Sequence, residues 1–316
     1  MMSMLDRMYA RTRHAITLLA ALGMAIAFMS MPALATDPKT FASPEEAAQA
    51  LLDAAASDDL NAIWGVLGDE FKDELTNEDA AQERENRRRI VAAAKEVLQL
   101  RADDDKTRVM VIGKDAWPMP IPIVKGDKGW SFDTGAGADE IIDRRVGANE
   151  LAAIDNLKAY VDAQVQYASE DRDGDDVLEY AQKINSTSGK KDGLYWEVAA
   201  GSTDEASPFG PFVAEKAAYL ADHEAGDSFM GYYYRIVTRQ GENAPGGRYD
   251  YVINGNMIGG FAMIAWPADY ANSGVMTFIV NQQGKVYQKD LGEKTDVNAA
   301  AIQDYNPDGS WTEVKE

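Results

Sequence analysis

The sequence contains no cysteine and only two histidines, His14 and His223. Without cysteine the chain can form no disulfide, carry no lipid at a cysteine and offer no thiol nucleophile. Structural zinc and copper sites are built largely from cysteine and histidine, so this composition excludes a Cys/His metal centre. The folded chain must therefore depend on its hydrophobic core, and 316 residues are enough to bury one.

The usual catalytic motifs are also missing. A serine nucleophile normally needs a histidine base, and there is no Gly-x-Ser-x-Gly elbow, although a Ser-Lys pair stays open. His223 precedes Glu224, but no second histidine completes a His-Glu-x-x-His motif, so we interpret it as a surface histidine. The glycine-rich segment 255–260 lacks the Lys-Ser/Thr of a phosphate-binding loop, and we interpret its glycines as allowing a bend in a sheet.

Positive charge is scarce. The chain has 31 basic and 52 acidic residues, for a net charge of −21. Nucleic acids and anionic lipids bind to positive surfaces, so this balance excludes nucleic acid as a partner. The aromatic and apolar fractions are those of a folded protein, and the charge therefore does not indicate disorder.

The first 35 residues are typical of an export signal. Arg7, Arg11 and Arg13 precede an apolar run over residues 15–31, and Ala33-Leu34-Ala35 then matches the pattern that a signal peptidase accepts. We predict cleavage after Ala35 and a periplasmic location; an uncleaved anchor is the alternative. No later stretch approaches membrane length, so no membrane span is expected after cleavage.

The first part of the mature chain favours helices followed by a small antiparallel sheet. Ser43, Pro44 and Glu46 form a capping box, and a second short helix is expected from Asp58 and Asp59. Thr76 and Asp79 suggest another capping box, which opens a third helix through about Leu98. Strands are predicted at residues 107–112 and 117–124, and a turn at residues 126–129 leads to the strand 130–133.

The second part favours one long helix packed on an antiparallel sheet. A helical stretch over residues 139–146 is expected to end at Gly147, and a long helix follows from Asn149. The predicted strands are residues 232–238, 249–253, 260–266, 275–281 and 285–288. The fold class is therefore α+β. We divide the chain into a signal peptide (1–35) and two α+β domains (36–147 and 148–316).

An acidic loop is the strongest candidate metal site. Asp171, Asp173 and Asp175 have the alternate spacing that lets carboxylates converge on calcium, and Glu179 is a candidate fourth ligand. The loop departs from the EF-hand pattern, with Asp176 in place of the turn glycine. A weaker partial match covers residues 304–309. We expect that the protein requires no cofactor and that calcium, if bound, fixes a loop.

Several segments in a fixed order resemble the DUF2950 family of exported bacterial proteins, which has no assigned function. In the first half they are Gly129-Trp130-Ser131-Phe132-Asp133 and residues 144–151, with the sequence RRVGANEL. In the second half they are DGLYW (192–196), SPFGP (207–211), GYYYR (231–235), YDYVING (249–255) and GVMTFIVN (274–281). The resemblance covers the mature chain and implies an exported location, but it transfers no catalytic residue.

Two fold-level similarities are weaker. The first half is similar to the small NTF2-like and cystatin-like domains, and the second half resembles the head of type IV pilins and pseudopilins. The chain departs from pilins because no processing motif with an apolar helix precedes Asn149. Similarity of fold alone does not carry function.

Three functional hypotheses follow. The first is a non-enzymatic binding or accessory protein of the cell envelope, acting on an envelope protein or glycan. The second is a carboxylate-based hydrolase of envelope polysaccharide or peptidoglycan, with Trp196, Tyr233 and Trp266 as the ligand surface. The third is an assembly or secretion accessory with a pilin-like domain, which a free sheet edge on the second domain would favour.

Overall fold

The computed structural model describes residues 35–57, 59–77, 79–172, 174–199, 202–216 and 227–315. The described residues from Thr36 onwards belong to one compact unit, and residues 1–35 are set apart from it. The predicted signal peptide lies outside the described residues, apart from Ala35 itself. Within the described residues, no helix has the length and hydrophobicity needed to cross a membrane.

The compact unit begins with four helices, α1 (Pro44–Ala56), α2 (Leu60–Leu67), α3 (Lys72–Leu75) and α4 (Ala80–Glu96). The predicted capping box is confirmed: Glu46 N donates to Ser43 Oγ at 3.2 Å, and Ala42 N donates to Glu46 Oε2 at 3.1 Å. Asp59 is the N-cap of α2, as expected. The predicted capping box of Thr76 and Asp79 is wrong, because Thr76 is the C-cap of α3 and Asp79 itself is the N-cap of α4.

The first sheet has the strand order β1-β2-β4-β5, and β3 also pairs with β2. Its strands are β1 (Leu98–Ala102), β2 (Thr107–Ile112), β3 (Trp117–Pro118), β4 (Ile123–Gly126) and β5 (Gly129–Phe132). All of the pairs are antiparallel. The sequence prediction missed β1, which leaves α4 directly and whose side chains are largely exposed.

A single helix, α5 (Thr134–Tyr167), covers the segment in which we expected two. The predicted break at Gly147 is wrong. A glycine in a helix interior costs only about 1 kcal/mol relative to alanine, and the packing of α5 on both sides of Gly147 offsets that cost. Two hydrophobic clusters, 41–141 and 153–314, lie on either side of this point. The division into domains at residue 147 stays a prediction.

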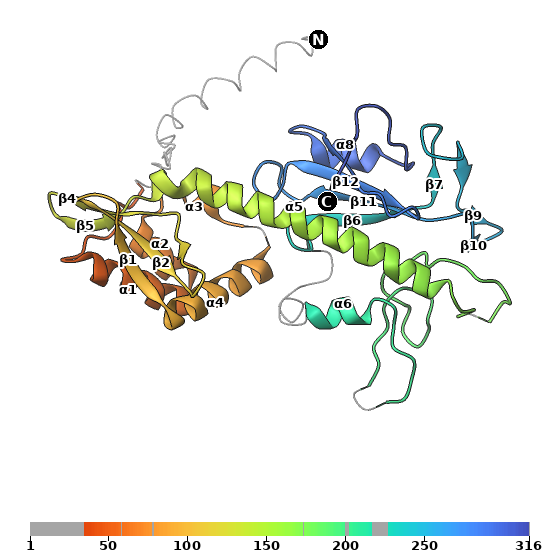
Figure 1. The fold of residues 1–316 in the computed structure, drawn as a ribbon, viewed down its shortest axis with the longest axis horizontal. Coiled ribbons are helices and arrows are strands. Elements are labelled where there is room, and N and C mark those ends of the chain that lie inside the picture. The colour runs from red at the N-terminus through yellow and green to blue at the C-terminus, as the bar shows by residue number, and fades with distance from the viewer. Residues whose placement is uncertain are drawn as a thin grey trace, which may run out of the picture. The chain divides into compact units, whose positions relative to one another are not determined.

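The second sheet has the order β14-β13-β12-β11-β6, with every pair antiparallel. Its strands are β6 (Tyr232–Val237), β11 (Ala262–Pro267), β12 (Met276–Asn281), β13 (Tyr287–Asp290) and β14 (Thr312–Glu313). Helix α5 packs against β11 and β12, and α8 (Thr295–Ala301) packs against β11 (Figure 1). The predicted α+β class is confirmed.

Short elements surround this sheet. They are α6 (Gly210–Glu215), β7 (Arg239–Gln240), β8 (Tyr249–Asp250), β9 (Val252–Ile253) and β10 (Asn256–Met257). Strands β7 and β8 form one antiparallel pair and β9 and β10 another. Both pairs follow β6 in the chain and precede β11.

The alternation of side chains along β6 assigns its two faces. Tyr234 Oη accepts a hydrogen bond from Asn156 Nδ2 of α5 at 2.7 Å, so Tyr232, Tyr234 and Ile236 point towards α5. Arg235 points to the opposite face, where its guanidinium donates to the Ala299 and Ile302 carbonyls at the end of α8. Burial raises the pKa of the Tyr234 hydroxyl, which therefore stays protonated as a hydrogen-bonding group.

Candidate binding surfaces

The described carboxylates of the acidic loop accept hydrogen bonds from nearby groups, most of them backbone N–H groups. Asp171 accepts hydrogen bonds from Gly174 N at 2.8 Å and from Asp176 N at 2.9 Å. Asp173 lies outside the described residues. Among the residues that the structure describes, no group of three potential Asp, Glu, His or Cys ligands gathers at one point.

The rest of the loop holds the β9–β10 pair. Asp175 accepts from Asn256 Nδ2 at 2.7 Å, and Glu179 accepts from Met257 N at 2.9 Å. In the weaker motif, Asp304 pairs with Arg239 and Arg248, and Asp308 accepts from Ser310 N. Calcium binding stays a prediction, and these contacts give both acidic segments a structural role.

Trp196 lies in an ion-pair cluster at the end of α5. Its indole Nε1 donates to the Glu205 carbonyl at 3.0 Å, and the cations of Arg172 and Lys191 lie 5.6 Å and 5.3 Å from its ring centre. The Arg172 side chain is only 3% exposed and pairs with Glu205. Hydrogen bonds from Lys191 and then Arg172 lower the pKa of the Glu205 carboxyl. This cluster holds Lys191, Trp196 and Glu205 at the end of α5.

Tyr233 and Trp266 form a separate pair. They lie opposite each other on β6 and β11, with ring centres 5.9 Å apart, on the face away from α5. Tyr233 is 36% exposed. Trp196 lies elsewhere, at the end of α5, where the Arg172 guanidinium contacts both its ring and the ring of Tyr167. The three aromatic residues predicted to form one ligand surface are therefore divided between two places.

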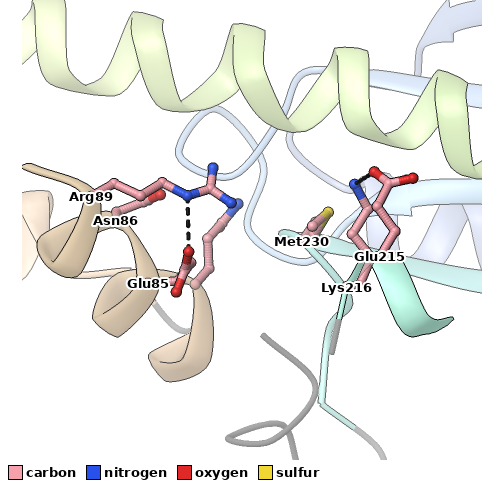
Figure 2. A pocket seen from close by; sticks show the side chains of 7 residues that line it. Glu85, Asn86, Arg89, Glu215, Lys216 and Met230 are labelled. Carbon is pink, nitrogen blue, oxygen red and sulfur yellow. Dashed lines mark hydrogen bonds and ion pairs between the residues drawn. The ribbon is translucent and has the colours of Figure 1, made fainter. Parts of the chain in front are cut away.

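A polar cleft of about 360 Å³ lies between α4 and the segments that carry α6 and the start of β6 (Figure 2). Its lining residues are Gln82, Glu85, Asn86, Arg89, Glu215, Lys216 and Met230. The two carboxylates are each paired with a cation: Glu85 with Arg89 at 2.9 Å and Glu215 with Lys216 at 2.9 Å. None of the three predicted aromatics lines this cleft, so it lacks the arrangement that the hydrolase hypothesis needs.

Buried polar contacts join the floor of this cleft to the second sheet. Asn149 of α5 is 1% exposed; its Oδ1 accepts from Gln82 Nε2 at 2.7 Å, and its Nδ2 donates to the Ser273 carbonyl at 2.8 Å. Glu150 Oε1 accepts from Val275 N and Met276 N, each at 3.0 Å, where β12 begins. The RRVGANEL segment therefore serves as a junction between α4 and the second sheet.

Arg145 completes this junction. Its guanidinium donates to the Leu75 carbonyl and to Asn272 Oδ1. Burial lowers the pKa of Arg145, and the nearby Glu83 and Asp269 oppose that shift. Burial likewise raises the pKa of the Glu83 carboxyl, against the attraction of Arg145 and Arg87. Arg145 and Glu83 attract each other inside the junction, and we therefore assign both a structural role.

The outer edge of β6 is the second candidate surface. In the β6–β11 ladder, Tyr233, Arg235 and Val237 exchange hydrogen bonds with β11, so the backbone groups of Tyr232, Tyr234 and Ile236 point outwards. Tyr232 exchanges its outward pair with Phe229, at 2.7 Å and 3.2 Å. Beyond the other end of β6, the Thr238 carbonyl accepts from Tyr251 N at 2.7 Å.

Between these two closed ends, the N–H and C=O groups of Tyr234 and Ile236 have no backbone partner among the described residues. We call this stretch the β6 window. Both residues are partly exposed. In Figure 1, β6 is the outermost strand of its sheet, on the side nearest to α6.

An aromatic row borders the window. The rings of Phe209 and Phe212 stack with centres 4.6 Å apart, Phe212 lies 5.8 Å from Phe229, and Phe229 meets Tyr234 at 6.2 Å. Each of these residues is partly exposed. The row lies on the α5 side of β6, because it includes the Tyr234 ring.

Sequence reasoning missed both the junction and the window. The aromatic run of residues 232–234 correctly predicted a strand, but an outer and an inner strand can carry the same residues. The one signal in the sequence was Gly231, directly before the aromatic run. In the structure both Met230 and Gly231 have positive φ, 51° and 76°. These two residues form a tight turn that begins a hairpin without continuing the ladder.

No curated protein and no solved structure matches the chain significantly. A family model described as "Protein of unknown function (DUF2950)" matches residues 38–314. The match spans both hydrophobic clusters, the junction and the β6 window, and it agrees with the resemblance found in the sequence. The chain belongs to the DUF2950 family.

Proposed function

We propose that this protein is exported to the periplasm, loses its leader after Ala35, and acts there as a non-enzymatic binding or accessory protein. It engages another envelope protein through the β6 window. The observation that carries this proposal is the pair of residues Tyr234 and Ile236, whose outward backbone groups lack a backbone partner among the described residues.

An unpaired strand edge is a template for another chain, and strand addition is a recurrent mode of peptide recognition. The window offers two donors and two acceptors. A typical net contribution of about 1 kcal/mol for each hydrogen bond gives roughly 4 kcal/mol in all, which corresponds to a dissociation constant in the millimolar range. Backbone pairing alone is therefore weak, and the aromatic row must supply the remaining affinity.

The geometry supports this function better than it supports hydrolysis. In the part of the chain that the structure describes, the carboxylates of the polar cleft are paired with cations, and the candidate sugar-stacking aromatics lie elsewhere. The open edge is instead the feature expected of an assembly or secretion accessory. That third hypothesis is the form of binding function that the fold favours.

The test is photo-crosslinking in cells. A photoreactive amino acid replaces Tyr233, next to the window, and in a control replaces Gln99 on β1. We expect an envelope protein, identified by mass spectrometry, to crosslink from position 233 and not from position 99. N-terminal sequencing of the recovered protein checks cleavage after Ala35, and fractionation checks the periplasmic location.

Two substitutions decide whether the crosslink depends on the window. Ile236→Pro removes one outward N–H without removing a donor from the β6–β11 ladder. Leu100→Pro makes the equivalent change on β1, where the register also points the Leu100 N–H outwards. The crosslink should disappear with Ile236→Pro and persist with Leu100→Pro. Absence of any crosslinked protein from position 233 in the parent protein would contradict the proposed function.

A further inference from the structure

On the basis of the cleavage after Ala35 that is part of the proposed function, we infer that Asp69 binds the α-ammonium group that this cleavage creates on Thr36. Hydrolysis of the Ala35–Thr36 peptide bond by water leaves a carboxylate on Ala35 and an amine on Thr36. The ordinary pKa of such an amine is about 8, so it is protonated at neutral pH. The mature N-terminus thereby has a fixed place on the fold.

The Thr36 nitrogen lies against the Asp69 carboxylate in the uncleaved chain. Thr36 N donates to Asp69 Oδ1, and Asp69 N donates in return to the Thr36 carbonyl at 3.2 Å. Cleavage changes the donor from a neutral amide to a cation. A hydrogen bond from a cation to a carboxylate is shorter and about twice as strong as one between neutral groups. Removal of the leader therefore strengthens a contact whose geometry exists beforehand.

The turn at Gly68 is shaped to receive this segment. Gly68 has a φ of 77°, and a Cβ at this position would lie 2.8 Å from the Thr36 carbonyl oxygen and 3.0 Å from Pro38. A side chain at position 68 would therefore push the segment away. Lys39 N donates to the Val66 carbonyl at 3.1 Å. These contacts hold the segment on both sides of Pro38 and leave the Thr36 nitrogen little freedom.

The charges around Asp69 suit a cation. Hydrogen bonds from the Thr36 side chain and then from its backbone lower the pKa of the Asp69 carboxyl, and the attraction of Lys72 adds to this shift. Asp69 is therefore ionised at neutral pH. The residues that follow Thr36 and Asp69 directly are Asp37 and Glu70, both exposed and both negative. Lys72 is thus outnumbered by carboxylates at the place of the new ammonium group.

The segment that begins at Thr36 also covers the outer side of β5. Phe41 N donates to the Trp130 carbonyl at 2.7 Å, and Trp130 N donates to the Phe41 carbonyl at 2.9 Å. Strand β5 is the last in its sheet, so this bridge pairs part of an edge that another chain could use. The second cation of the segment, Lys39, lies 5.4 Å from the centre of the Phe41 ring. Binding at Asp69 fixes the beginning of the segment that covers this edge.

The position of the cleavage decides whether the site is filled. A chain that begins at Ala35 carries its ammonium group up to about 3.8 Å further along the backbone and presents a neutral Thr36 amide to Asp69. A chain that begins at Asp37 has no nitrogen at that place. Only a chain that begins at Thr36 presents its ammonium group to Asp69 without a change in the backbone.

The decisive experiment measures the pKa of the α-amine. The exported protein is purified from cells, and N-terminal sequencing identifies its first residue. Trace amounts of an amine-acylating reagent are then applied from about pH 6 to pH 10, a range that spans the ordinary pKa of an α-amine. Mass spectrometry gives the labelled fraction of the N-terminal peptide. A synthetic peptide of residues 36–41 supplies the reference for an α-amine without a binding site.

Asp69→Asn keeps an acceptor oxygen at the same place and removes its charge. We expect the α-amine pKa to be about 0.5 higher in the parent protein than in Asp69→Asn or the peptide, because the ion pair is exposed to solvent. Labelling at neutral pH should then be about threefold slower in the parent protein. High salt should reduce the difference. The matched control is Glu70→Gln, which removes a neighbouring charge and should keep most of the rise.

A chain that begins at Ala35, released from a cleavable fusion, tests the site without any substitution. It should show little of the rise. Equal α-amine pKa values in the parent protein and in Asp69→Asn would overturn the inference, and so would an equal rise in the chain that begins at Ala35.

The two readouts separate this inference from the proposed function. An exported protein that begins at Thr36 but has an ordinary α-amine pKa would reject the inference and leave the proposed cleavage standing. A first residue other than Thr36 would contradict the proposed cleavage itself, and with it the use of Asp69 as the site of the mature N-terminus.

Discussion

The outer strands β1 and β6 solve the same problem in different ways. Each has one side paired in an antiparallel sheet and an outer side with backbone groups that could recruit another chain. Strand β1 carries Arg101 and is followed by three aspartates, and its side chains are mostly exposed. Strand β6 is rich in tyrosine, and its ends are closed by Phe229 and Tyr251.

The difference fits the proposed function, in which the edge of β1 is protected from pairing and the edge of β6 is used for it. On β1, Arg101 lies within the strand and three aspartates follow it directly, and charge at a strand edge discourages pairing with other chains. On β6 the neighbouring segments limit pairing to Tyr234 and Ile236, and the aromatic row provides side-chain contacts at that place. Under the proposed function, the limited length of the window would let it pair with a matched segment without allowing the sheet to grow.

The largest expected effect comes from proline on the paired side of β6. Arg235→Pro removes an N–H from the β6–β11 ladder and the two hydrogen bonds from the Arg235 guanidinium to the end of α8. We expect it to lower the free energy of unfolding by about 3 kcal/mol or more. Urea denaturation followed by circular dichroism measures this change.

On both β1 and β6, proline should cost less stability at a residue whose N–H points away from the sheet than at one whose N–H bonds to the neighbouring strand. Ile236→Pro and Leu100→Pro should each lower the free energy of unfolding by only about 1 kcal/mol, because neither removes a ladder donor. Gln99→Pro, on the paired side of β1, should resemble Arg235→Pro in direction. Similar losses for Ile236→Pro and Arg235→Pro would show that the assigned register of β6 is wrong.

The next largest expected loss of stability comes from the junction around residues 144–151, which links α3 and α4 to the second sheet. Arg145→Met keeps most of the apolar stem but removes the hydrogen bonds to the Leu75 carbonyl and Asn272. We expect a loss of about 2–3 kcal/mol in unfolding free energy. The matched control is Arg144→Met, whose contacts with Glu140, the Pro118 carbonyl and Trp117 all lie on the first-sheet side.

Arg145→Met should also make unfolding less cooperative, because the two hydrophobic clusters would then share fewer contacts. Hydrogen exchange measured by mass spectrometry can report β2 and β11 separately. In Arg145→Met, the protection of backbone amides against exchange should fall by different amounts in β2 and β11. In Arg144→Met, it should change by the same amount in both strands. An identical response in both variants would assign Arg145 no special linking role.

A smaller effect, dependent on pH, comes from Glu83 at the same junction. Burial raises its pKa above the ordinary value of 4.5, so the folded state binds the proton more tightly than the unfolded state. The contribution of Glu83 to stability is therefore fully present below about pH 4.5 and is lost as the pH rises through the folded-state pKa. Relative to Glu83→Gln, the parent protein should become less stable across that window.

Unfolding free energies measured by urea at acidic and neutral pH test this prediction. The two proteins should converge at acidic pH and differ most at neutral pH. Glu85→Gln is the control, since Glu85 pairs with Arg89 at the rim of the polar cleft. A parent protein that gains stability over Glu83→Gln as the pH rises would reverse the assigned cause.

The elements that local signals specify were predictable from the sequence. The capping box at Ser43 and the strand predicted at residues 275–281 depend on near neighbours, and the structure has both, the strand as Met276–Asn281. The break at Gly147 was wrong because the space around it is open and the helix is held on both sides. Tertiary packing offsets a local preference of about 1 kcal/mol.

The candidate surfaces were harder to predict, because each depends on distant pairing. Asp175 and Glu179 had the spacing of ligands, yet in the fold they contact Asn256 and Met257, far along the chain. The RRVGANEL segment gave no chemical signal until Asn149 met Gln82 and Ser273. Whether β6 is an inner or an outer strand is likewise a property of the sheet order, which no local pattern records.

The smallest expected effect lies in the turn that closes one end of the β6 window. Met230 and Gly231 connect Phe229 to Tyr232 with positive φ at both positions, and Asn254 and Gly255 do the same between β9 and β10. A non-glycine residue in this conformation costs about 1–2 kcal/mol, and asparagine tolerates it better than methionine. We expect Met230→Asn to raise the unfolding free energy by about 0.5–1 kcal/mol.

The reverse substitution supplies the control. Asn254→Met should lower the unfolding free energy by a similar amount, since the two turns share the same geometry and differ in the residue at the first position. Urea denaturation measures both changes, and a loss of stability in Met230→Asn would show that this turn accommodates methionine at least as well as asparagine.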